Sequence, residues 1–248
     1  MSRSQELERF LEEGNEIIIL DECVVESFKS NNPYGTLHKH FKILKQFPYS
    51  VFASYNRGEL FREELNTGIP VQADRVICNE CTETLRDILS LDEAQLEFKL
   101  GQQKPKAMSL IEEYDDFAEE HIRGLAIKSD SVDISSYRND KVKLNTDIAI
   151  VSADVPKLLL ENKCKQPFDF QNFVENKSMI FIVSFANTWK AIRWRLNRGF
   201  EQAKPKVMGN DGFDLKYVAI SCYFDGILTN ENWLKDCRES ALSLYNIH

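Results

Sequence analysis

The chain has 248 residues, and 43% of them are hydrophobic, which is enough apolar material for one large domain with its own core. Its formal net charge of −8 excludes a broad basic surface, so contact with nucleic acid requires a local basic patch. The sequence shows no apolar leader and no run of about 18 apolar residues, and its six cysteines are scattered. We therefore expect a reduced, cytoplasmic protein that does not span a membrane.

Buried runs alternate with helical patterns along the chain. Apolar runs typical of strands occur at 16–21, 49–54, 75–78, 146–152, 179–184 and 226–228. Helical patterns occur at 4–13, 24–30, 37–46, 60–65, 79–89, 92–128, 156–162, 186–203, 214–222 and 233–244. This alternation predicts an α/β fold with a mainly parallel sheet.

Acidic residues stand at the ends of several of these elements. Asp21 closes the first strand, and Glu80 and Glu83 lie one turn apart on the helix at 79–89. Asp214 opens the helix before the last strand, and Glu231 follows that strand. The carboxyl ends of parallel strands are where ligands bind, and clustered carboxylates suit Mg²⁺ or Mn²⁺. The alternative for each single acid is a helix cap or a solvated surface position.

In this order and context the acids resemble the PIN-domain nucleases. The matching segments are Ile17-Ile18-Ile19-Leu20-Asp21, the helical acids in Glu80-Cys81-Thr82-Glu83, the helix-opening Asp214, and Ile227-Leu228-Thr229-Asn230-Glu231 followed by Trp233. The chain departs from the family pattern at Glu22-Cys23 and in carrying Glu at position 231.

The resemblance implies a single domain over 1–248, a three-layer α/β/α fold with a large helical insertion at about 90–185. It implies a Mg²⁺- or Mn²⁺-dependent phosphodiesterase, an endoribonuclease in preference to a DNA enzyme. Asp21, Glu83, Asp214 and Glu231 would form the catalytic cluster, with Glu80 as the substitute metal ligand for Glu83. Because the interval before Asp214 is long, Asp147 and Asp154 remain rival strand-end acids.

A basic segment is the second feature. Lys190, Arg193, Arg195 and Arg198 fall within ten positions, and Trp189 and Trp194 are interleaved with them. Phosphates need cations and unstacked bases pack on aromatic rings, so this helix is the predicted contact for RNA or another single-stranded nucleic acid. The alternative is a solvated charged face with the tryptophans in the core.

Two further motifs are weaker. Cys78 and Cys81 form a Cys-x-x-Cys pair, but a structural zinc site needs four ligands, and His38 and His40 point apart on a helix. Buried free thiols are the default expectation for this pair, ahead of zinc or a redox dithiol. The run ending in Asp21-Glu22 also suits nucleoside triphosphatases, but the phosphate-binding loop with its lysine is missing from the sequence.

The sequence therefore supports two functions of different classes. The first is the metal-dependent nuclease. The second is a catalytically inactive scaffold with the same fold that binds protein or RNA, with an acidic, aromatic-rich surface suited to a protein partner or to a second copy of the chain.

Overall fold

The computed structural model describes residues 3–109, 111–112, 120, 123–124, 127, 140–197 and 205–245. Within them the protein is mainly helical, with one two-stranded parallel sheet. The chain divides into two compact units. Unit 1 comprises Met1–Asn56 and Asp74–Glu113, and unit 2 comprises Arg57–Ala73 and Tyr114–His248.

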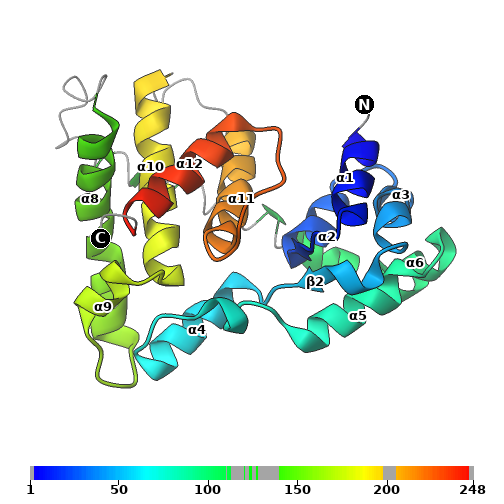
Figure 1. The fold of residues 1–248 in the computed structure, drawn as a ribbon, viewed down its shortest axis with the longest axis horizontal. Coiled ribbons are helices and arrows are strands. Elements are labelled where there is room, and N and C mark those ends of the chain that lie inside the picture. The colour runs from blue at the N-terminus through cyan, green and yellow to red at the C-terminus, as the bar shows by residue number, and fades with distance from the viewer. Residues whose placement is uncertain are drawn as a thin grey trace. The chain divides into compact units, whose positions relative to one another are not determined.

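Unit 1 surrounds the small sheet with helices (Figure 1). The short 3-10 turns are labelled η. The elements of unit 1 include α1 (Arg3–Glu12), β1 (Ile17–Ile19), α2 (Asp21–Ser27), α3 (Pro33–Leu44), η1 (Pro48–Ser50), β2 (Val51–Ala53), α5 (Asn79–Leu89), α6 (Glu93–Leu100) and η3 (Gly101–Gln103). Along the chain, η2 (Ala73–Arg75) spans the boundary between the two units. The two strands pair in parallel, with Ile17 opposite Val51 and Ile19 opposite Ala53. Their apolar side chains join the helices in one core.

Local capping explains where the helices of unit 1 begin. The Asn32 side chain accepts a hydrogen bond from the backbone of Gly35, with Pro33 in the first turn of α3. Asp92 and Gln95 form a reciprocal capping box at the start of α6. The sequence predicts a break between helices at 31–35, whereas in the structure Asn32 and Pro33 start α3.

Unit 2 is a helical assembly arranged around α10 (Met179–Asn197). The other helices are α4 (Arg57–Thr67), α8 (Lys141–Lys163), α9 (Phe170–Glu175), α11 (Pro205–Ser221) and α12 (Asn232–Ser243). α10 packs against α4, α8, α11 and α12. α8 and α10 run side by side, and α12 crosses α10 and α11 (Figure 1).

Pro156 lies inside α8 and does not end it. A proline has no N–H, so it leaves the carbonyl four residues earlier without its helical partner. That carbonyl belongs to Ser152, and it accepts a hydrogen bond of 2.7 Å from the Ser184 hydroxyl on α10. A neighbouring helix therefore satisfies the acceptor that the proline leaves open.

The structure corrects several predicted strands. Residues 146–152 lie inside α8, and residues 179–184 form the first turns of α10. Residues 226–228 have no regular structure, and the segment at 75–78 contributes an isolated antiparallel bridge between Ile77 and Ser54. The strands at β1 and β2 are confirmed. Helices with a small parallel sheet are thus what the described residues form, and among them no helix has the length and apolarity needed to cross a membrane.

Candidate functional site

Asp21 lies where the sequence predicts it, directly after β1 at the carboxyl end of the parallel pair. Leu20 occupies the N-cap position of α2, and Asp21 and Glu22 form the acidic first turn of that helix. The Asp21 side chain is exposed. A carboxylate in the first turn is stabilised by the positive end of the helix dipole, so this placement has a structural reason independent of any metal.

Glu80 and Glu83 are exposed on α5. The helix starts beside the end of β2, where the Thr82 hydroxyl accepts a 2.9 Å hydrogen bond from the backbone of Ala53. One turn later the Arg86 guanidinium donates to the carbonyl of Pro48, which precedes β2. α5 therefore runs back along β2, with Thr82 beside the last residue of that strand.

The other two predicted ligands belong to unit 2. Asp214 lies well inside α11 instead of opening a helix, so that part of the prediction is wrong. Glu231 occupies the N-cap position of α12 without a side-chain capping bond. Its carboxylate accepts a 2.5 Å hydrogen bond from the indole of Trp233.

A lysine, not a metal ligand set, organises the charges of this region. Lys190 on α10 is buried, and its ammonium lies 2.9 Å from the Asp211 carboxylate and 3.1 Å from the centre of the Trp233 ring. The same Asp211 oxygen accepts a 2.7 Å hydrogen bond from the Trp194 indole. We call Lys190, Asp211, Trp194 and Trp233 the lysine cluster.

The lysine cluster joins three helices through one cation. Burial lowers the pKa of Lys190, while the negative charges of Asp211 and Asp214 act in the opposite direction. Asp214, expected as a metal ligand, is thus close enough to Lys190 to interact with its charge. A buried ion pair needs good geometry to offset the loss of water around both groups, and the indoles complete the surroundings of this one.

The four predicted metal ligands lie on four different helices or at their starts. Among the side chains that the structure describes, no group of three or more His, Cys, Asp or Glu residues is placed to hold one. Asp21 and Glu83 belong to unit 1, and Asp214 and Glu231 belong to unit 2, so their convergence on one metal ion stays a prediction. The rivals Asp147 and Asp154 both lie on α8, inside a helix and not at a strand end.

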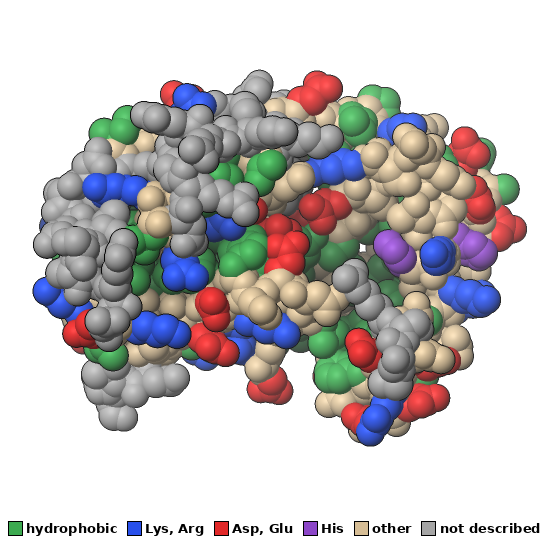
Figure 2. Space-filling view, turned by 90° about the horizontal axis from the view of Figure 1, so that it is seen from above, with side chains coloured by type: hydrophobic (Ala, Val, Ile, Leu, Met, Phe, Trp, Pro, Cys, Tyr) green, Lys and Arg blue, Asp and Glu red, His purple; other side chains and the backbone are tan. Residues whose placement is uncertain are grey.

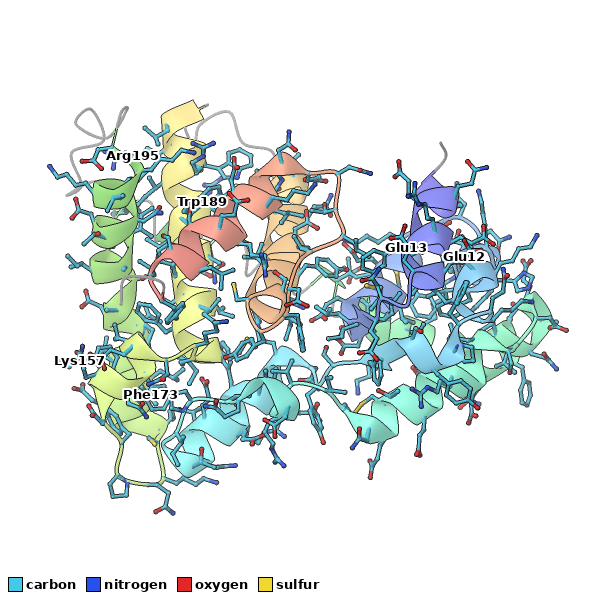
Figure 3. All side chains as sticks on the ribbon, viewed as in Figure 1. Glu12, Glu13, Lys157, Phe173, Trp189 and Arg195 are labelled. Atoms are coloured by element: carbon cyan, nitrogen blue, oxygen red, sulfur yellow. A yellow bond between two sulfur atoms is a disulfide. The ribbon has the colours of Figure 1, made fainter. Side chains whose placement is uncertain are left out.

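Two of the basic residues predicted to contact nucleic acid make contacts within the protein. Lys190 is committed to the lysine cluster, and the Arg193 guanidinium lies 5.3 Å from the centre of the Trp189 ring. Arg195 lies toward the C-terminal end of α10 (Figure 3), and Arg198 lies outside the described residues. On the face shown in Figure 2, basic side chains are scattered among acidic ones and do not form one patch. Phosphate contact by Arg193 and Arg195 stays a prediction.

Glu64 is a buried acidic group that the sequence pattern does not predict. It is 0% exposed on α4, and its carboxylate accepts four hydrogen bonds. The donors are the backbone N–H groups of Val71 at 3.0 Å, Met179 at 2.8 Å and Ile180 at 2.9 Å, and the Ser178 hydroxyl at 3.0 Å. Burial raises the pKa of Glu64, and the four hydrogen bonds oppose this. Glu64 caps the start of α10 from a helix more than 100 residues earlier.

An apolar hollow on α6 was also missed. Phe98 is 89% exposed, and with Leu91 and Ala94 it lines an open hollow of about 490 Å³, bordered by Asp92, Gln95 and Lys99. The sequence did carry a signal for it. Leu96 and Leu100 face the core, and Phe98 lies between them, half a turn away on the outer side of the helix.

The cysteines correct another expectation. Cys78 and Cys81 are joined by a disulfide, so neither has a thiolate to offer zinc. The expectation of free thiols at this pair is therefore wrong, and free thiols are found at Cys23, Cys164, Cys222 and Cys237. Burial raises the pKa of Cys222 to about 12, which keeps that thiol protonated and unreactive at neutral pH.

Comparison with known proteins identifies no relative. No protein-family model, no curated protein and no solved structure matches this chain.

Proposed function

We propose that this protein is a non-catalytic interaction module that binds a peptide segment of a partner protein on the outer face of α6. The observation that carries the proposal is the exposure of Phe98, which lines an open apolar hollow together with Leu91 and Ala94. Contiguous exposed apolar surface can mark an interaction site, and aromatic anchors dominate the energy of many interfaces. We call Leu91, Ala94 and Phe98 the α6 face.

The α6 face stands on a rigid support. Its opposite side buries Leu96 and Leu100 in the core of unit 1, and its first turn is fixed by the Asp92–Gln95 capping box. A surface held in one conformation loses little entropy on binding, which favours affinity for a short segment. The α6 face therefore meets the physical requirements of a preformed docking site.

Charge indicates which segment would bind there. The helix and its cap carry three exposed acids, Asp92, Glu93 and Glu97, and one exposed base, Lys99. An acidic border favours basic residues through complementary charge. The partner we propose is a peptide with one apolar or aromatic anchor flanked by Lys or Arg.

The test is a selection of random displayed peptides on the whole protein and on two variants. Phe98→Ser removes the anchor, and Ile69→Ser removes another exposed apolar side chain, 58% exposed, in unit 2. We expect an apolar anchor with basic flanks to be enriched by the wild type and by Ile69→Ser, and to be lost with Phe98→Ser. Enrichment that persists in Phe98→Ser would refute the proposal. Concentration-dependent dimerisation abolished by Phe98→Ser would replace the peptide with a second copy of the chain.

The metal-dependent endonuclease with a PIN-like three-layer fold is the second candidate, and one observation favours it. Asp21 is exposed at the carboxyl end of a parallel strand, which is the position that the resemblance requires. Its test is a Mn²⁺ titration followed by melting temperature and by RNA cleavage, in the wild type and in Asp21→Asn. Stabilisation by Mn²⁺ that is lost in Asp21→Asn would support the nuclease. Its absence in both proteins would leave the interaction module.

A further inference from the structure

The Cys78–Cys81 disulfide lies at the start of a helix in unit 1. Cys78 is the N-cap residue of α5, and its sulfur accepts a hydrogen bond of 3.1 Å from the backbone N–H of Cys81. The Cα atoms of the two cysteines are 5.2 Å apart, within the usual range for a disulfide. The N-terminal end of a helix stabilises negative charge, and a thiolate there gains from both the dipole and the free N–H groups.

The two sulfurs differ in access. Cys78 is only 3% exposed, whereas Cys81 is partly exposed at the edge of the core. A thiolate from solution therefore meets the Cys81 sulfur first. Cys78 is then the leaving group, and it leaves as a thiolate directly at the helix start, with the Cys81 N–H as its hydrogen-bond donor.

The backbone around the pair is held by bonds other than the disulfide. The Cys78 N–H donates to the Ala53 carbonyl at 2.9 Å. Thr82 bonds both segments, because its hydroxyl donates to the Cys78 carbonyl at 2.8 Å and accepts from the Ala53 N–H at 2.9 Å. A bond across a loop of three residues removes little loop-closure entropy, so the fold depends weakly on it. The dithiol form therefore keeps the same geometry and can close again.

From these observations we propose that Cys78 and Cys81 form a reversible thiol–disulfide exchange centre that reacts with a dithiol. One thiolate of the dithiol attacks the Cys81 sulfur, the Cys78–Cys81 bond breaks, and Cys78 departs as a thiolate. The second thiolate of the dithiol attacks its own sulfur in this mixed disulfide and releases Cys81. The dithiol leaves as its disulfide, and the two protons that its thiols lose end on Cys78 and Cys81.

The charge near the pair selects among reductants. Glu80 lies between the two cysteines and Glu83 one turn further on, and both are exposed. Their negative charges disfavour the approach of anionic thiols such as glutathione. A neutral dithiol, or a protein dithiol with a basic surface, is the class of reactant that fits.

A redox titration of the full chain tests the exchange. The protein is equilibrated with mixtures of reduced and oxidised dithiothreitol under native conditions, quenched with acid, and alkylated in denaturant. The chain has six cysteines, four of them free, so we expect four labels in the oxidised state and six in the reduced state. The two added labels should map together to Cys78 and Cys81 and disappear when the dithiol is reoxidised. Six labels in oxidising buffer, or reduction only in denaturant, would overturn the proposal.

Variants with serine at one position of the pair test the order of events, because each leaves one sulfur of the pair, whose labelling is mapped separately from that of the four other free cysteines. Cys78→Ser retains a capping oxygen at the helix start and exposes the Cys81 thiol. Cys81→Ser leaves only the buried Cys78. We expect the Cys81 thiol to form a mixed disulfide with an aromatic disulfide reagent at least about tenfold faster than the Cys78 thiol, since access governs the rate. Equal rates in two folded variants, or the reverse order, would contradict the mechanism.

Charge removal gives an independent readout. In Glu80→Gln/Glu83→Gln the native disulfide should react faster with glutathione, while its rate with neutral dithiothreitol stays within about twofold. Unchanged glutathione rates would refute the role of the two acids in selecting the reactant. This inference concerns α5 and is independent of the binding proposed for the α6 face.

Discussion

Glu64 is the group whose removal should disturb unit 2 most. Glu64→Ala leaves four buried donors without their acceptor: three backbone N–H groups and the Ser178 hydroxyl. A buried donor left unsatisfied costs about 1–3 kcal/mol, so the lower limit for four donors is roughly 4 kcal/mol. Because domains are stabilised by about 5–15 kcal/mol in total, we expect a large fraction of the stability of unit 2 to be lost. Glu64→Gln keeps one oxygen and should cost roughly half as much.

The pH dependence of this loss follows from the pKa of Glu64. Burial raises that pKa above 4.5, so the folded protein holds the proton more tightly than the unfolded chain does. The free energy of unfolding should then fall as the pH rises from about 4.5 through the raised pKa, and become level above it. Glu64→Gln has no such proton, so the stability advantage of the wild type should shrink as the pH rises. An advantage that grows with pH would show that hydrogen bonding outweighs burial.

The assay is urea unfolding followed by tryptophan fluorescence. All three tryptophans, Trp189, Trp194 and Trp233, lie in unit 2, so the signal reports that unit alone. Glu161→Ala is the matched control, because it removes an exposed glutamate from α8 in the same unit, and it should change the stability by less than about 0.5 kcal/mol. A loss below about 1 kcal/mol in Glu64→Ala would refute the capping of α10 by Glu64.

Two further predictions concern buried contacts of unit 2. Lys190→Met should lower the free energy of unfolding by about 3–5 kcal/mol, because it leaves Asp211 buried without its cation. In urea unfolding followed by circular dichroism, Lys190→Met/Asp211→Leu should recover part of this loss. Losses that add up in the double variant would contradict a coupled pair. Gly68 and Gly14 both have left-handed backbone angles (φ 69° and 83°), but only at Gly68 would a Cβ meet the Pro167 carbonyl, at 2.6 Å. Gly68→Ala should therefore destabilise the protein by more than the ~1–2 kcal/mol of backbone strain expected for Gly14→Ala, as measured by hydrogen exchange near each site, and equal costs would refute the clash.

Local signals predicted α1, β1, β2, α5 and the last helix closely. The apolar run at 17–20 is bounded by Glu16 and Asp21 and is too short for a helix, so a strand follows directly from its sequence. α5 shows a clear buried face at Thr82, Leu85 and Leu89. These elements contain the information for their own ends, which is why sequence and structure agree there.

The run at 179–184 could not be predicted in the same way. Met179, Ile180, Phe181 and Ile182 are all buried in α10, and a helix apolar on every side has no periodicity to distinguish it from a central strand. The start of this helix is also set by a distant group. Its cap is Glu64, 115 residues before Met179 in the chain, so no local capping residue announces it.

The predicted metal ligands show the same limit for a site. Asp21 and Glu80 lie in the first turns of α2 and α5, and Glu231 is the N-cap residue of α12. Carboxylates are stabilised by about 0.3–1 kcal/mol at such positions. The preference of acids for helix starts is therefore enough to explain why they occur between strands and helices. A metal site needs in addition that acids from distant segments meet in space. Asp214 is predicted to bind a metal ion, but the structure places it where its charge acts on the ammonium of Lys190, which belongs to another helix. Spacing along the chain therefore identifies candidate ligands, whereas contacts with distant segments determine the role of each acid.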